Sequence, residues 1–147
     1  ANILVADDLR CCIADFGLSL IPAGSQSWTS VVTSTMKGSM RWMGPELFHH
    51  NGSLDLNLNC PSRDIYAFGC TILELPFCDC KTDYNVLTAL MAGKRPVRPS
   101  KVWYPSEIWD LTNCCWVQEA TARPTAHEVY SALQHIRKMQ DLSTVPF

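Results

Sequence analysis

The segment "SRDIYAFGCTILEL" constrains the fold more than any other part of the sequence. Apolar side chains recur there every three or four residues, at Ile65, Phe68, Ile72 and Leu75, and most of the other faces are apolar or small as well. A helix that is apolar nearly all round belongs at the centre of a core, with other elements packed around it. The sequence therefore predicts a mainly helical protein built around this segment.

Further segments predict the helices that cover it. Residues 82–94 open with a Thr-Asp cap and end near Gly93, which is a common C-terminal helix signal. A helix is also predicted over 105–116, and Pro124 opens a last one that is apolar on one face. The "GPELFHH" stretch can form a short helix with a proline in its first turn. Together these segments predict a helical bundle.

The beginning of the chain predicts a different element. "NILVA" and "CCIA" are short apolar runs separated by "DDLR", the pattern of a tight antiparallel hairpin. Asn2 begins the first strand and Asp15 follows the second, so both can lie at the same end and share a ligand. A carboxylate after a buried strand is costly to desolvate unless it binds a cation, which makes Asp15 a candidate site residue. The alternative is that both are only turn residues at the hairpin end.

The composition is that of an ordinary globular protein, with 47% hydrophobic and 18% charged residues. A net charge of -2 gives no electrostatic support for a nucleic-acid partner. No apolar run has the length of a membrane-spanning helix, and the start lacks the pattern of a signal peptide. We therefore expect an intracellular, cytoplasmic protein without a membrane partner, and the sequence indicates no oligomeric state.

Eight cysteines invite a disulfide or zinc interpretation. They contain no C-x-x-C, and the histidines stand at no zinc-finger spacing from them, so reduced and mostly buried thiols are the prediction. A small metal module stays as a weaker alternative.

Residues 18–43 are rich in hydroxyls and show no sustained period, which predicts a long loop. Those hydroxyls either take phosphate as a switch or only keep the loop soluble.

In this order, the motifs resemble the signature set of protein kinases. Asn2 resembles the asparagine that closes the catalytic loop, and "DFG" at 15–17 the metal-binding triplet. "GSMRWMGPE" at 38–46 looks like the end of an activation segment, with "GPE" in place of the usual A-P-E. The segment from Ser62 looks like the central helix of the C-lobe, and "CWVQEATARPTAHEV" like its last conserved block.

The resemblance implies a partial kinase domain over residues 1–139, with a tail at 140–147 and no N-lobe. Its parts would be a hairpin with DFG at 1–17, an activation segment at 18–46 and a helical bundle at 47–139. This corresponds to the distal C-lobe.

By resemblance, Asp15 would bind the Mg²⁺ that bridges the phosphates of ATP, and Asn2 the second Mg²⁺. Oxygen ligands suit this hard cation. Gly17, Ser39, Arg41 and Trp42 would belong to the activation segment and its substrate-facing end. The "G-S-x-R-W-M" form resembles the tyrosine-kinase-like group, in which a hydroxyl residue at position 39 favours serine or threonine of a protein substrate.

Three other residues would be structural. Glu46 of "GPE" would form a buried ion pair with Arg123 of "ARP", pinning the activation segment to the helical bundle. Asp64 would accept hydrogen bonds from the backbone of the catalytic loop.

The chain also departs from the family pattern. It contains no H-R-D base, glycine-rich loop or strand lysine, so we predict that it phosphorylates nothing measurably by itself. The segment "LELPFCDC" is several residues shorter than usual, and the chain starts at Ala1, which together suggest a truncated gene model or a degraded paralogue. The alternative to a kinase fragment is a non-catalytic pseudokinase that serves as a docking or scaffold module. Apolar faces around Phe68 and Ile72 would meet water, so an aggregation-prone or molten chain is expected.

Overall fold

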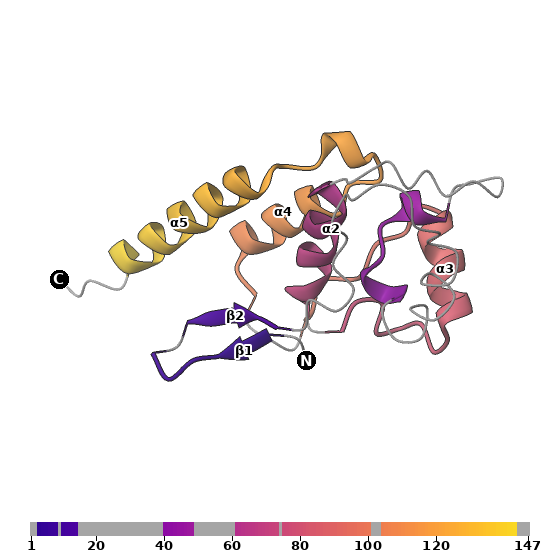
Figure 1. Ribbon diagram of the computed structural model, residues 1–147, viewed down its shortest axis with the longest axis horizontal. Coiled ribbons are helices and arrows are strands. Elements are labelled where there is room, and N and C mark those ends of the chain that lie inside the picture. The colour runs from indigo at the N-terminus through magenta and orange to yellow at the C-terminus, as the bar shows by residue number, and fades with distance from the viewer. Residues whose placement is uncertain are drawn as a thin grey trace, which may run out of the picture.

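The computed structural model describes residues 3–8, 10–14, 40–48, 61–73, 75–100 and 104–143. The elements in chain order, shown in Figure 1, are the strands β1 (Ile3–Val5) and β2 (Cys11–Ile13), the 3₁₀ turns η1 (Met40–Trp42) and η2 (Pro45–Leu47), the helices α2 (Pro61–Thr71), α3 (Asp83–Met91) and α4 (Ser106–Cys115), the 3₁₀ turn η3 (Ala120–Ala122), and the helix α5 (Ala126–Ser143). The described part is thus mainly helical with one hairpin, as the sequence predicts.

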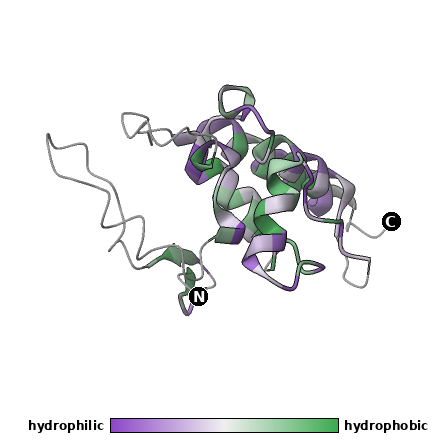
Figure 2. Cartoon of the chain, turned by 90° about the vertical axis from the view of Figure 1, so that its right-hand side faces the viewer, coloured by the Kyte–Doolittle hydropathy of each residue, from purple (hydrophilic) through white to green (hydrophobic). Residues whose placement is uncertain are grey.

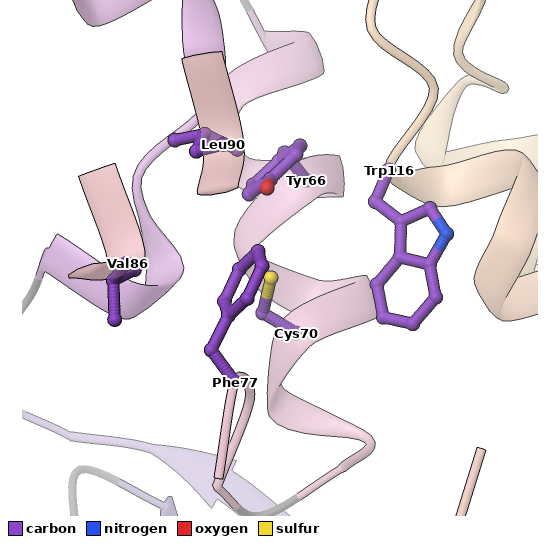
Figure 3. Close-up of a cluster of buried hydrophobic side chains, with 6 residues drawn as sticks. All are labelled: Tyr66, Cys70, Phe77, Val86, Leu90 and Trp116. Atoms are coloured by element: carbon purple, nitrogen blue, oxygen red, sulfur yellow. The ribbon is translucent and has the colours of Figure 1, made fainter. Parts of the chain in front are cut away.

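Helix α2 lies at the centre of the helical part. One buried cluster joins it to α3 and to the segments that follow α2 and α4 (Figure 3); its members are Tyr66, Cys70, Phe77, Val86, Leu90 and Trp116. A second cluster joins α2 to α4 and α5; its members are Ile65, Leu111, Cys115, Val129 and Ile136. The central position predicted for this segment is confirmed, because both clusters contain residues of α2.

Glycine lets α2 and α4 approach closely. A Cβ atom built on Gly69 would lie 2.8 Å from the Cβ of Cys115, which is closer than carbon atoms tolerate. The contact therefore requires the smallest residue at this position of α2. It places α4 directly against α2.

The helix boundaries follow local capping chemistry. The hydroxyl of Thr82 accepts a hydrogen bond from the Asn85 amide, which starts α3. Beyond its end, Gly93 has a φ of +72°, a conformation that suits glycine and stops the helix. Glu128 accepts from the Thr125 amide while the Thr125 hydroxyl accepts from the Glu128 amide, a capping box that opens α5.

Three expectations for the helices need correction. The helix that starts the core ends at Thr71 rather than continuing to Leu75, and it is not buried all round. Phe68 on α2 is 36% exposed, in line with the expectation that the face around it meets water, and Leu75, beyond the end of the helix, is 52% exposed. The short helix expected at 44–50 is a single 3₁₀ turn, since η2 spans three residues.

The hairpin is paired antiparallel, with Ile3 opposite Ile13 and Val5 opposite Cys11. Its turn is closed by a hydrogen bond from the Ala6 amide to the Arg10 carbonyl, at 2.8 Å. All six strand residues are exposed, so neither face is covered by a described element. The prediction of a buried strand before Asp15 is therefore wrong for the described residues, and the cost of desolvating this carboxylate no longer supports a bound cation. Figure 2 shows the hairpin as an apolar strip at the edge of the helical part.

Candidate functional site

The segment 40–48 carries the predicted end of the activation segment, and an ion pair ties it to the helices. Arg123 contacts Glu46 through both ends of its guanidinium: Nη2 lies 2.7 Å from Oε2, and Nη1 lies 2.9 Å from Oε1. The Arg123 side chain is fully buried, and that of Glu46 is 18% exposed. The two side chains that the motifs predict to pair are therefore in two-pronged contact across 77 residues of sequence.

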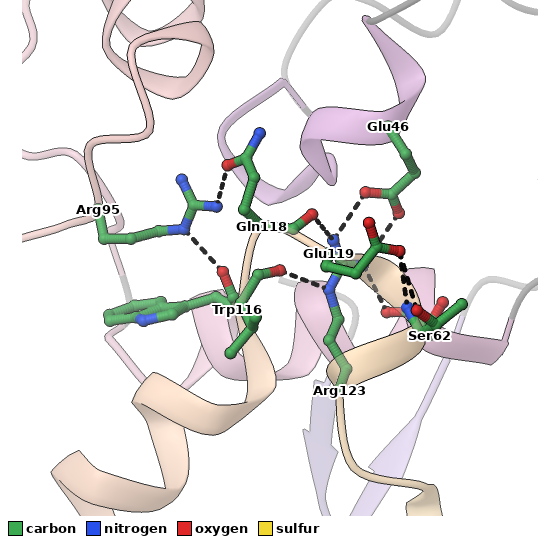
Figure 4. A network of polar contacts seen from close by, with 9 residues as sticks. Glu46, Ser62, Arg95, Trp116, Gln118, Glu119 and Arg123 are labelled. Atoms are coloured by element: carbon green, nitrogen blue, oxygen red, sulfur yellow. Dashed lines mark hydrogen bonds and ion pairs between the residues drawn. The ribbon is translucent and has the colours of Figure 1, made fainter.

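Arg123 has further partners that make it a junction (Figure 4). Its Nε donates to the Val117 carbonyl and its Nη1 to the Ser62 carbonyl, each at 2.9 Å. Its guanidinium also lies 4.9 Å from the ring centre of Tyr66, within the range of a cation–π contact. One side chain thus connects η2, the start of α2, and the loop before η3.

The ion pair changes the acidity of Glu46. Burial by itself would raise the pKa of this carboxyl, but the hydrogen bonds and charge of Arg123 outweigh it, so the pKa is lowered. Glu46 therefore remains ionised when it is held against Arg123. A Cβ at Gly44 would lie 2.4 Å from the carboxylate oxygen Oε1, so the glycine of "GPE" leaves room for the folded-over side chain.

Arg41, the next residue predicted from the motifs, turns toward the helical part. Its guanidinium donates to the carbonyls of Pro76, Phe77 and Cys80, at distances of 3.1, 2.6 and 2.8 Å. Trp42 beside it packs against the buried cluster of α2 and α3. These carbonyl contacts could not be anticipated, because backbone acceptors carry no signature in the sequence.

The interior beneath this segment contains two weak acids. Burial raises the pKa of Tyr66 and raises that of Cys70 to about 12. The Tyr66 hydroxyl has no hydrogen-bond partner within the described ranges, and two arginines, Arg95 and Arg123, lie over its ring. Both acids therefore stay protonated at neutral pH, and they act as packing groups rather than as bases or nucleophiles.

The other predicted site residues are less fully defined. Asn2, Asp15, Gly17 and Ser39 lie outside the described residues. Asp64 is exposed in the first turn of α2. Within the part of the chain that the structure describes, no three His, Cys, Asp or Glu side chains gather as a metal site. The same part holds no helix that is long and apolar enough to cross a membrane.

Comparison with known proteins decides the family. The sequence model of the family of protein tyrosine and serine/threonine kinases matches residues 1–133. The chain belongs to the protein kinase family. The ion pair of Arg123 and Glu46 thus joins two of the kinase motifs, "GPE" and "ARP".

Relatives named as serine/threonine kinases and a relative named as a tyrosine kinase match nearly the whole chain. A protein of Acanthamoeba polyphaga mimivirus named as a serine/threonine-protein kinase/receptor is 31% identical over 96% of the chain. A protein of Dictyostelium discoideum named as a serine/threonine-protein kinase is 29% identical over 92%, and the tyrosine-protein kinase Abl of Drosophila melanogaster is 30% identical over 92%. The chain spans 8%, 17% and 8% of the lengths of these kinases, respectively.

Proposed function

We propose that this chain is the helical base of a kinase domain that transfers the γ-phosphoryl group of ATP to serine or threonine of a protein substrate. The observation that supports it best is the two-pronged contact of Arg123 with Glu46. It fastens the end of the activation segment to the helices, which is what a substrate-binding segment needs in order to hold a fixed position. The form "GSMRWM" supports hydroxyl acceptors of the serine and threonine type.

Magnesium would be held at one end of the hairpin. The register pairs Ile3 with Ile13, so the chain continues to Asn2 and to Asp15 from the same end of the two strands. An amide oxygen and a carboxylate are donors that fit Mg²⁺. When bound, the metal would neutralise charge on the phosphates of ATP. Residues 1–39 would supply this metal-binding end and most of the activation segment.

The 147 residues alone are proposed to be inactive, because they contain no H-R-D aspartate to accept the substrate proton. The alternative for the whole protein is a pseudokinase-type scaffold module. An assay separates the two. The protein expressed from its complete coding sequence would be incubated with γ-labelled ATP, Mg²⁺, and either casein or a Glu-Tyr copolymer. The kinase proposal expects label on serine or threonine of casein, abolished by Asp15→Asn. Absence of transfer to either acceptor would leave the scaffold, and label on tyrosine alone would contradict the acceptor class.

A second experiment addresses the metal end on the chain itself. Mn²⁺, which accepts the same oxygen ligands as Mg²⁺, broadens nearby amide NMR signals. We expect selective broadening at Ile3 and Ala14 that disappears in Asp15→Ala. The matched control is Asp8→Ala, which removes a carboxylate from the opposite end of the hairpin, where Asp8 pairs with Arg10 at 2.6 Å. Broadening centred on the turn, or none at all, would argue against the proposed magnesium site.

The exposed hairpin also predicts how the isolated chain behaves. Its strand residues are apolar or cysteine and lie open on both faces, whereas the helices contain two buried clusters. We therefore expect self-association through the hairpin at high concentration rather than a molten helical part. Sedimentation velocity at increasing concentration would measure it, and a chain that stays monomeric throughout would contradict this expectation.

A further inference from the structure

Arg41 holds a segment that is distant in sequence and unusual in conformation. The three carbonyls that it contacts belong to residues 35 to 39 positions later, in the connection between α2 and α3. We call residues 75–80 the α2–α3 connection. It comprises the last six residues of "LELPFCDC", the segment that is shorter here than the usual kinase pattern. Arg41 thus donates hydrogen bonds to carbonyls on both sides of Cys78.

The α2–α3 connection needs such support. Phe77 has a φ of +54°, in the left-handed region that a residue with a bulky side chain rarely adopts. Its side chain is nevertheless buried in the cluster with Tyr66 and Cys70. Backbone strain of this kind persists only where the surroundings hold it in place. The Phe77 carbonyl accepts from the Cys80 amide as well as from Arg41, so the turn and the guanidinium stabilise each other.

The geometry of the contact selects arginine. Nη1 donates to two carbonyls and Nη2 to a third, all from one planar group. A lysine ammonium is a compact point charge and does not present this fork. Because the guanidinium is occupied by backbone carbonyls, it is directed toward the helical part and away from any acceptor that approaches η1 from outside.

We propose that Arg41 is a positioning residue for the substrate-facing segment, which it couples to the α2–α3 connection so that the two move as one unit. This inference rests on the proposed function for the meaning of "substrate-facing". In this role Arg41 fixes η1 and the neighbouring Trp42 against the core and makes no contact with the protein substrate.

Amide hydrogen exchange on the full chain in dilute solution tests the coupling without ATP or catalysis. Arg41→Met and Arg41→Lys are each expected to accelerate exchange of segments 40–48 and 75–82 by at least about tenfold, since hydrogen bonds from a charged group are lost. Segments in α4 and α5 should exchange as before. The matched controls are Arg98→Met and Arg98→Lys. Arg98 also donates to a backbone carbonyl, that of Tyr104, and its loss should leave both segments unchanged.

A reciprocal change separates coupling from ordinary local support. A Gly-Gly insertion after the exposed Cys78 loosens the α2–α3 connection without touching residues 40–48. Coupling predicts faster exchange in 40–48 as well, and little further acceleration when Arg41→Met is added to the insertion, because changes in one unit are not additive.

Four results would overturn the proposal: Arg41→Lys protected as well as the unaltered chain, an insertion whose effect stops at 75–82, equal acceleration in α4 and α5, or no protection of either segment in the unaltered chain. None of them touches the phosphoryl-transfer assay. The positioning role and the proposed kinase function can therefore fail separately.

Discussion

The hairpin and the helical part are built from similar apolar residues but stand in opposite surroundings. Leu4 of β1 is 58% exposed, whereas Leu90 of α3 is 1% exposed. The helices bury their apolar faces against one another around α2, whereas no element in the described ranges covers the two strands. A two-stranded hairpin is marginally stable in water without a covering layer. The contrast indicates that the helical part contains its own core and that the hairpin depends on something beyond the described residues.

Removing Arg123, the junction of the helical part, should lower the free energy of unfolding more than any other change. Arg123→Ala leaves the Glu46 carboxylate without its partner and also removes donors to the Val117 and Ser62 carbonyls. We expect a loss of about 3–5 kcal/mol in the free energy of unfolding, measured with urea in dilute solution. The control is Arg137→Ala, whose exposed contact with Asp141 at 4.0 Å should contribute no more than about 0.5 kcal/mol. Equal losses in the two variants would contradict the junction.

Replacing one leucine by alanine in each region should have very different effects on stability. Leu90→Ala should lower the free energy of unfolding by about 2–5 kcal/mol, because it removes a buried side chain from the first cluster. Leu4→Ala should change it by less than about 0.5 kcal/mol, since the side chain is already exposed to water. Urea unfolding followed by circular dichroism measures both. A hairpin variant as damaging as the core variant would remove the distinction between the regions.

The helices and the hairpin were predictable because their signals are local. Apolar periodicity identified α2 to α5, and the caps at Thr82 and Gly93 identified the ends of α3. The extent of α2 was not predictable, since apolar residues continue after Thr71 while the chain turns. Whether Phe68 or Leu75 is covered depends on elements that a local pattern does not contain.

Contacts in the site were predictable only where both contacting residues belong to known kinase motifs. The contact of Glu46 with Arg123 follows from two kinase motifs, and the structure places the two side chains together. The role of Arg41 followed from no motif, because its acceptors are carbonyls of the α2–α3 connection and depend on the left-handed turn at Phe77. The functions assigned to Asn2, Asp15, Gly17 and Ser39 stay predictions, since these residues lie outside the described ranges.

A substitution that disturbs the close approach of α2 and α4 should lower the free energy of unfolding by a smaller amount. Gly69→Ala places a Cβ against the Cβ of Cys115, and neither atom is at the end of a flexible side chain. Helix α2 must shift, at a cost of about 1–3 kcal/mol by urea unfolding. The control is Ser131→Ala, at an exposed position of α5, which should leave the free energy of unfolding nearly unchanged. If Gly69→Ala proved neutral, the packing between the two clusters would be looser than described.

The smallest expected effect is on the dependence of stability on pH. The pKa of Glu46 is lowered in the folded chain, so its contribution is fully present above the ordinary value of 4.5 and is lost as the pH falls below it through the lowered value. Unfolding free energies of the unaltered chain and of Glu46→Gln should therefore converge in that acidic range. A constant difference between them at every pH would show that the ion pair does not supply the stabilisation.

Residue-resolved amide exchange of the monomeric chain tests the contrast between the regions most directly. Amides in the middle of α2 and α4 should exchange only by opening of the whole helical part, whereas the strand amides of the hairpin should exchange by local opening at low cost. We expect protection in the helices to exceed that in β1 and β2 by orders of magnitude. Equal protection in the hairpin and the helices would contradict it.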